Sequence, residues 1–80
     1  MIATLTGKLK IKLNNQIVID VNGVGYCLQV SKNTLDNIGE VDETVTLNTD
    51  LQVRDDSILL YGFEFQSELN MFKLLQSIQG

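Results

Sequence analysis

Hydrophobic and polar residues alternate along the first part of the chain. From Ala3 to Leu13, apolar residues and Gly7 take one set of alternate positions, and threonines and lysines take the other. Strict alternation is typical of a strand with one buried face. Gly7 falls on the inner face, where a missing side chain lets the backbone bend as barrels require. The pattern therefore predicts a long, curved strand over residues 3–13.

A hairpin is predicted next, over residues 16–31. Residues 16–21 alternate, and the following Asn22-Gly23 is a strong hairpin signal because both positions tolerate a positive φ. Alternation then resumes, and one face of the returning strand carries Val24, Tyr26 and Leu28.

The next segments predict a connection and a second hairpin. Residues 32–43 lose the alternation and hold at most a short helical turn around 34–38. Alternation returns over residues 44–53, and a short apolar run covers 57–63. Arg54-Asp55-Asp56 separates these two strands, so the hairpin has an acidic tip.

After Phe63 the apolar period changes to that of a helix. We expect this helix from about Ser67 to Ile78, since Ser67 is the only good N-cap near its start. Its apolar stripe is expected to pack on the core, with the alternative that part of it packs on a further domain. The stripe contains Met71, Phe72, Leu74, Leu75 and Ile78.

Five strands followed by one helix predict a mainly β protein. The natural candidate is the five-stranded OB-fold barrel, over residues 1–63, with a C-terminal α-helix in residues 64–80. If this is right, the mostly buried residues include Leu5, Leu9, Val24, Tyr26, Leu28, Val45 and Leu47.

Composition narrows the possible functions. The net charge of −4 argues against strong nucleic-acid binding by this chain alone, because such binding rests on Lys and Arg. No apolar run is long enough to cross a bilayer and the N-terminus lacks a signal-peptide pattern, so we expect a soluble, cytoplasmic protein without a membrane partner. Cys27 is the single cysteine and histidine is absent, so Cys27 is interpreted as a packed thiol.

Few residues suit catalysis or cofactor binding. There is no histidine and no phosphate-binding glycine loop, so neither an active site nor a cofactor is expected. Asp55 and Asp56 supply too few oxygens for a divalent metal. From the residues alone, their favoured interpretation is as turn formers. A lysine stripe at positions 8, 10 and 12 is interpreted as a solvated face rather than a phosphate contact, and Tyr26 and Tyr61 as core rather than base-stacking platforms.

Several motifs together resemble one known family along essentially the whole chain. They are Met1-Ile2 with Leu5 and Gly7, Gly23-Val24-Gly25-Tyr26, Val45 with Leu47 and Thr49, Val53-Arg54-Asp55-Asp56, and Leu60-Tyr61-Gly62-Phe63. The chain resembles the N-terminal domain of the RuvA family, the bacterial Holliday-junction-binding proteins.

The resemblance implies a non-catalytic subunit that acts in DNA recombination and repair. RuvA family members form homotetramers that hold the four-way junction open for ATP-driven branch migration by the RuvB motor, and the RuvC resolvase is a further expected partner. The resemblance makes Asp55 and Asp56 an acidic pin near the junction centre, which reverses the preference for turn formers. Arg54 becomes a DNA-contact candidate.

The sequence departs from the family pattern in three places. The family more often has Glu at the position of Asp55, usually has Arg at that of Leu69, and has a polar helix cap where Phe65 stands here. Family members continue beyond a position like Gly80 into helix-hairpin-helix motifs and a mobile C-terminal domain, so we interpret the chain as a domain fragment. The alternative function is a small barrel for protein interaction or oligomerisation, and a single-strand binder would require exposed aromatic residues.

Overall fold

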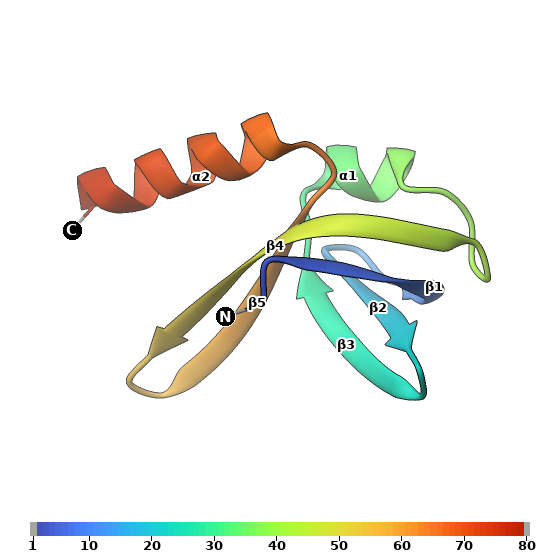
Figure 1. Ribbon diagram of the computed structural model, residues 1–80. Coiled ribbons are helices and arrows are strands. Elements are labelled where there is room, and N and C mark those ends of the chain that lie inside the picture. Colours follow the sequence, from blue (N-terminus) through green and yellow to red (C-terminus); the bar gives the residue numbers. More distant parts are fainter. Residues whose placement is uncertain (1, 80) are drawn as a thin grey trace.

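The structure, a computed structural model, describes residues 2–79 and contains five strands and two helices there (Figure 1). The strands form a closed barrel in the order β1-β2-β3-β5-β4. This confirms the predicted mainly β barrel followed by a C-terminal helix. The elements are β1 Thr4–Lys12, β2 Gln16–Val21, β3 Val24–Gln29, α1 Lys32–Asn37, β4 Thr44–Arg54, β5 Ser57–Phe63 and α2 Gln66–Gln79.

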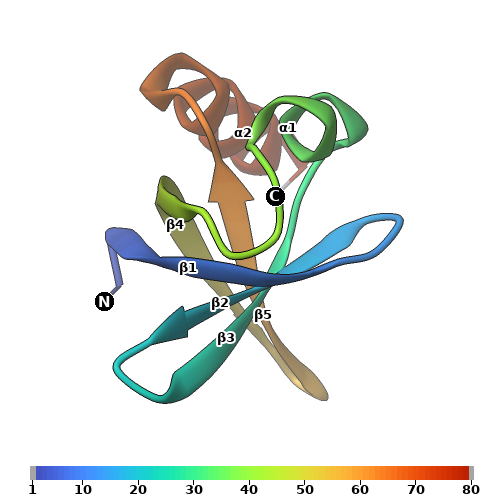
Figure 2. The ribbon, with the colours of Figure 1, turned by 90° about the vertical axis from the view of Figure 1, so that its right-hand side faces the viewer.

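Strand β1 closes one side of the barrel by pairing antiparallel with both β2 and β4. On the other side, β3 meets β5 in parallel through the pair Gln29 and Tyr61. The two helices lie on the same side of the barrel (Figures 1 and 2). Neither helix of residues 2–79 is long and apolar enough to cross a membrane.

The core confirms most of the predicted inward positions. Leu9, Leu28 and Leu47 are fully buried, and Leu5 and Val45 are nearly so. Tyr26 is half-buried against this core. The prediction was wrong for Val24, which is 53% exposed. It pairs with Val21 beside the turn, where the hairpin extends beyond the core.

A β-bulge in β1 explains a second difference from the predicted pattern. Leu9 pairs with Ile19, but Ile11 pairs with Val18, so Lys10 is an extra residue in the ladder. One extra residue reverses the face of every later side chain. As a result, Ile11 and Leu13, which the alternation placed inside, are exposed.

Cys27 lies on the outer face of β3. It pairs with Val18 of β2, whereas its neighbour Leu28 points into the core. The thiol-bearing residue is exposed, so the interpretation as a packed thiol was wrong. Alternation within β3 is the cause, because Cys27 and the buried Leu28 point to opposite faces of the strand.

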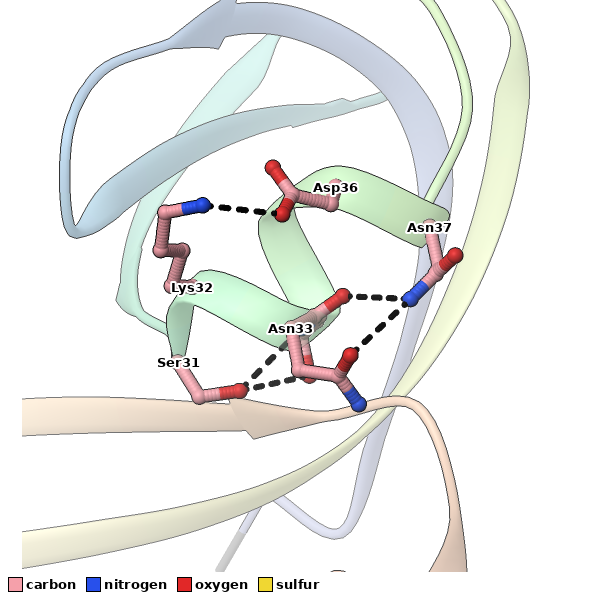
Figure 3. A network of polar contacts seen from close by, with 6 residues as sticks. Ser31, Lys32, Asn33, Asp36 and Asn37 are labelled. Carbon is pink, nitrogen blue, oxygen red and sulfur yellow. Dashed lines mark hydrogen bonds and ion pairs between the residues drawn. The ribbon is translucent and has the colours of Figure 1, made fainter.

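Helix α1 fills part of the predicted connection, beginning two residues earlier than the expected turn. Ser31 caps it, and the Ser31 Oγ accepts a hydrogen bond of 3.1 Å from the backbone N–H of Thr34 (Figure 3). Asn37 donates to the Asn33 carbonyl at 2.8 Å, and Lys32 pairs with Asp36. These local bonds stabilise a helix of only six residues.

Helix α2 starts at Gln66, and its cap differs from the predicted Ser67. The carbonyl of Phe65 accepts from the N–H groups of Glu68 and Leu69, which places Phe65 at the N-cap. In return the Phe65 N–H donates to the Glu68 carboxylate at 3.3 Å. A Glu at the third helical position supplies half of a capping box, so the helix starts without a polar N-cap side chain.

Candidate nucleic-acid interface

The acidic tip is the two-residue turn of the β4–β5 hairpin. The strands pair in register as far as Arg54 and Ser57, and Asp55 and Asp56 connect them. The hairpin extends away from the rest of the barrel (Figure 1). Near its end Val53 and Ile58 form a cross-strand pair, and each is 69% exposed. Both aspartates are therefore presented to solvent at the end of a projecting ribbon.

The turn at the tip does not depend on special properties of aspartate. Among residues 2–79, non-glycine residues with positive φ are Asn22 and Asp42, so neither tip aspartate adopts the left-handed region. By contrast, Asn22 and Gly23 have φ of 51° and 89°, as the predicted hairpin turn requires. Neither tip carboxylate makes a hydrogen bond within the described residues. The geometry thus leaves both carboxylates free for other contacts.

Arg54 points away from the tip aspartates and toward α2. Its Nη2 donates to Oε1 of Gln76 at a distance of 3.2 Å. The ion pairs of residues 2–79 are Lys10–Asp42 and Lys32–Asp36, and neither includes Arg54 or a tip aspartate. Gln52, Val53, Arg54, Asp55 and Gln76 line an open depression between the hairpin and the helix. The structure therefore brings the three predicted site residues to one end of the molecule but pairs none of their charges.

Aromatic packing fixes α2 above the outer face of this hairpin. The Phe72 ring lies 4.8 Å from that of Tyr61 and 5.1 Å from that of Phe63, measured between centroids. Leu69 on the same side of the helix is buried. Packing of the predicted apolar stripe on the barrel is confirmed only for Phe72, since Met71, Leu74, Leu75 and Ile78 are exposed. The alternative, that part of the stripe packs on a further domain, stays a prediction.

The packed face of α2 ends in a residue that the sequence pattern did not single out. Leu69, Phe72 and Gln76 are spaced three and four residues apart, so they share one helix face. Gln76 lies outside the predicted apolar stripe. The sequence signal that could have identified Gln76 is its position one helical turn after Phe72, on the face that Leu69 and Phe72 share.

The lysines of β1 fit the predicted solvated face. Lys10 forms an ion pair of 3.3 Å with Asp42, and Lys12 donates to the Gly39 carbonyl at 2.9 Å. The bulge also separates their directions, because it reverses the faces after Lys10. A continuous phosphate-facing stripe is therefore absent from β1.

The aromatic residues and the acidic residues do not form a further binding site in the described part of the chain. Tyr61 packs against Phe72 with the two rings tilted, and Tyr26 packs against the core, so both tyrosines are half-buried and not exposed as base-stacking platforms would be. Phe65, at the start of α2, is 57% exposed. Within residues 2–79, no group of three or more His, Cys, Asp or Glu side chains is arranged to hold a metal ion.

Comparison with protein families gives a match over most of the chain. The family described as the RuvA N terminal domain matches residues 1–62. The chain belongs to the RuvA N-terminal domain family. The match covers both hairpin turns, the acidic tip and the barrel strands up to the penultimate residue of β5, so it includes every motif on which the resemblance rested except Phe63.

Individual RuvA relatives extend this similarity through α2. The chain is 46% identical to the Holliday junction branch migration complex subunit RuvA of Zymomonas mobilis, 45% to that of Acetivibrio thermocellus and 49% to that of Neisseria meningitidis. Each alignment covers all 80 residues of the chain and 38%, 40% and 41% of the relative, respectively. The chain therefore spans about two fifths of the length of these RuvA proteins.

Two departures from the RuvA pattern have a local structural explanation. Leu69, where the family usually has Arg, is only 5% exposed in the packed face of α2. Phe65, where the family has a polar cap, is supported by the Glu68 side chain. Both residues lie at the start of α2, outside the strands of the barrel.

Proposed function

We propose that the chain is the barrel domain of a protein that binds four-way DNA junctions during branch migration. Its membership of the RuvA N-terminal domain family carries the proposal, and the names of the relatives support it. The names do not favour the alternative of a general interaction module. In this proposal, residues 1–63 form the barrel and residues 64–80 lead into a helix-hairpin-helix domain.

We propose further that the complete protein acts as a homotetramer without catalytic activity of its own. The ATPase is then the RuvB motor, and RuvC is a second partner. These proposals follow from the family resemblance, and we propose the cytoplasm as the location because bacterial chromosomal DNA lies there. The sparse inventory of catalytic side chains in the sequence is consistent with this division of labour.

The proposed role of Asp55 and Asp56 is electrostatic. A unit charge about 10 Å from a phosphate raises its energy by about 0.4 kcal/mol in water before screening. Two carboxylates facing several phosphates would therefore add about 1 kcal/mol or more of electrostatic repulsion. This repulsion would keep the exchanging strands apart at the junction centre and disfavour binding to an uninterrupted duplex.

Arg54 is proposed as a DNA contact that contributes less to junction recognition than Asp55 and Asp56. Arg54 is exposed, and its guanidinium group is suited to hydrogen bonding with phosphate oxygens. Its hydrogen bond to Gln76 would hold the charge beside the pin rather than at its end.

The test is the double substitution Asp55→Asn with Asp56→Asn in the complete protein that the gene encodes. Asn keeps the shape and turn-forming capacity while it removes two negative charges. We expect tighter DNA binding by about fivefold, a weaker preference for junction over duplex, and an altered branch-migration rate with the motor present. Binding is measured by titration of labelled junction and duplex at several salt concentrations.

Salt provides the internal control. Screening acts over about 10 Å at 0.1 M, so each effect of the double substitution should shrink as salt rises. Substitution of two acids outside the tip, Asp36→Asn with Glu40→Gln, changes the net charge equally and should leave junction preference unchanged. If the tip variant matches the unmodified protein at low salt in binding, preference and migration, Asp55 and Asp56 are only turn residues.

A further inference from the structure

Arg54 is the nearest cation in sequence to the acidic tip, yet it does not neutralise it. An arginine beside two carboxylates would ordinarily be expected to form a charge-assisted hydrogen bond with one of them. Here its Nη2 donates instead to the neutral side-chain oxygen of Gln76, at 3.2 Å. Within residues 2–79 neither Asp55 nor Asp56 takes part in an ion pair.

The placement of Gln76 follows from how α2 is anchored. Leu69 is buried and Phe72 packs between Tyr61 and Phe63, which fixes this face of the helix over the outer face of the hairpin. Gln76 lies one turn beyond Phe72 on the same face and is half-buried. The side-chain amide oxygen of Gln76 therefore lies beside the hairpin, close to the end that carries the tip.

Strand alternation brings Arg54 to the same place. Residues 50, 52 and 54 of β4 share the outer face under α2, and Asp50 on this face is almost fully buried. Asp55 and Asp56 lie beyond the last strand pair, Arg54 and Ser57. The guanidinium can therefore turn either toward the helix or toward the tip, and the helix offers it an acceptor without adding charge.

We propose that Gln76 is a positioning residue that holds Arg54 away from the tip and so leaves both aspartates unneutralised. The consequence for DNA rests on the proposed function of the tip. The structural part of the proposal is that Arg54 bonds to Gln76 and not to the aspartates. That part does not depend on the proposed function.

The structural test is Gln76→Met in the 80-residue chain. Met keeps the length and the helix propensity of the side chain but removes the amide oxygen. We expect the Arg54 guanidinium to move within hydrogen-bonding distance of Asp55 or Asp56 in a crystal structure or by nuclear Overhauser contacts. The matched control is Gln66→Met on the same helix, whose amide bonds Asn70 instead. This control should leave Arg54 on Gln76.

The functional test uses the same substitution in the complete protein. A neutralised tip should reduce the preference for junction over duplex by about 1.5- to 5-fold at low salt, as expected for one exposed ion pair. The change should have the same direction as that of Asp55→Asn with Asp56→Asn. Gln76→Glu, which retains an acceptor for Arg54, should preserve the preference.

Arg54→Met separates this mechanism from a general effect on the helix. With Arg54 absent, Gln76→Met should cause no further loss of junction preference. An equal loss in both backgrounds would contradict the proposal, and so would a Gln76→Met structure in which Arg54 stays away from both aspartates. If the double aspartate variant has no effect on DNA, the proposed tip function fails, and the position of Arg54 still decides the inference.

Discussion

Gly7 and Gly62 occupy positions where a side chain has no room. A Cβ on Gly62 would approach Leu28 Cδ2 to 2.8 Å, which is the end of a flexible side chain. A Cβ on Gly7 would instead overlap the backbone carbonyl oxygen of Asp20. Backbone cannot rotate aside as a side chain can, so Gly7 permits the close approach of β1 to β2 that closes the barrel.

Gly7→Ala should therefore lower the free energy of unfolding substantially. We expect a loss of about 3 kcal/mol or more, at or beyond the upper end of ordinary overpacking, because strands must separate to accept the methyl group. Chemical denaturation followed by circular dichroism measures the change.

Gly25→Ala is the matched control for that substitution. Its added Cβ meets only Val18 Cγ1, at 3.3 Å, so a small side-chain adjustment suffices. The expected cost is below about 1.5 kcal/mol. Equal stability of the Gly7→Ala and Gly25→Ala proteins would show that the approach of Gly7 to Asp20 is not what closes the barrel.

At the scale of elements, α2 has one packed face and one exposed apolar face. Leu69 is 5% exposed and Leu74 is 56% exposed, although they have the same side chain on the same helix. Only the first stands between the helix and the barrel. The attachment of α2 therefore rests on a short contact made by Leu69 and Phe72.

Leu69→Ala should loosen this attachment, whereas Leu74→Ala should not. Removing a buried leucine costs about 2–5 kcal/mol where the cavity persists, and we expect the lower end because α2 lies at the edge of the fold. The readouts are the free energy of unfolding and hydrogen exchange of the α2 amides. Equal protection of α2 in the two variants would contradict the assignment of Leu69 as its anchor.

The alternation of apolar and polar residues predicted where most strands lie, because alternation and turn-forming residues are local properties of the sequence. Gln16–Val21 and Ser57–Phe63 have the predicted bounds, and Asn22-Gly23 forms the expected turn. The bulge at Lys10 was not predictable in this way, because it depends on pairing with β2. Val24 was misplaced for a related reason: alternation gives the face of a residue, but not how far its hairpin extends beyond the core.

The candidate site was predicted in part. Arg54, Asp55 and Asp56 are adjacent in sequence and belong to a motif, so they could be found without a structure. Gln76 could not, because its contact joins a hairpin to a helix, and single glutamines carry no sequence signal. The free state of the tip carboxylates likewise depends on where the Arg54 side chain points.

For the whole molecule, charge limits what the isolated chain can do with DNA. Ten acidic residues outnumber six basic ones, and two of the lysines are already engaged within β1 and its neighbours. Affinity for phosphates rests on available Lys and Arg. The chain alone thus has few free cations to offset the repulsion of DNA that we propose for its acidic tip.

We therefore expect the 80-residue chain to bind a four-way junction only weakly. At physiological salt its affinity should be no better than the non-specific range of about 10⁻⁴ to 10⁻⁶ M. Titration of a labelled junction and a matched duplex measures this. Nanomolar, junction-selective binding by residues 1–80 would refute the expectation.

The single ladder pair between β3 and β5 also affects how the molecule can associate with other copies of itself. Away from Gln29 and Tyr61 the two hairpins diverge, which leaves facing strand edges without a partner in the described part of the chain (Figure 1). Unpaired edges are templates for strand addition and aggregation, and natural proteins protect them with charge. Asp55 and Asp56 stand at the end of one such edge. The same carboxylates proposed to repel DNA strands would then also act as gatekeepers that keep the protein from polymerising through its own sheet.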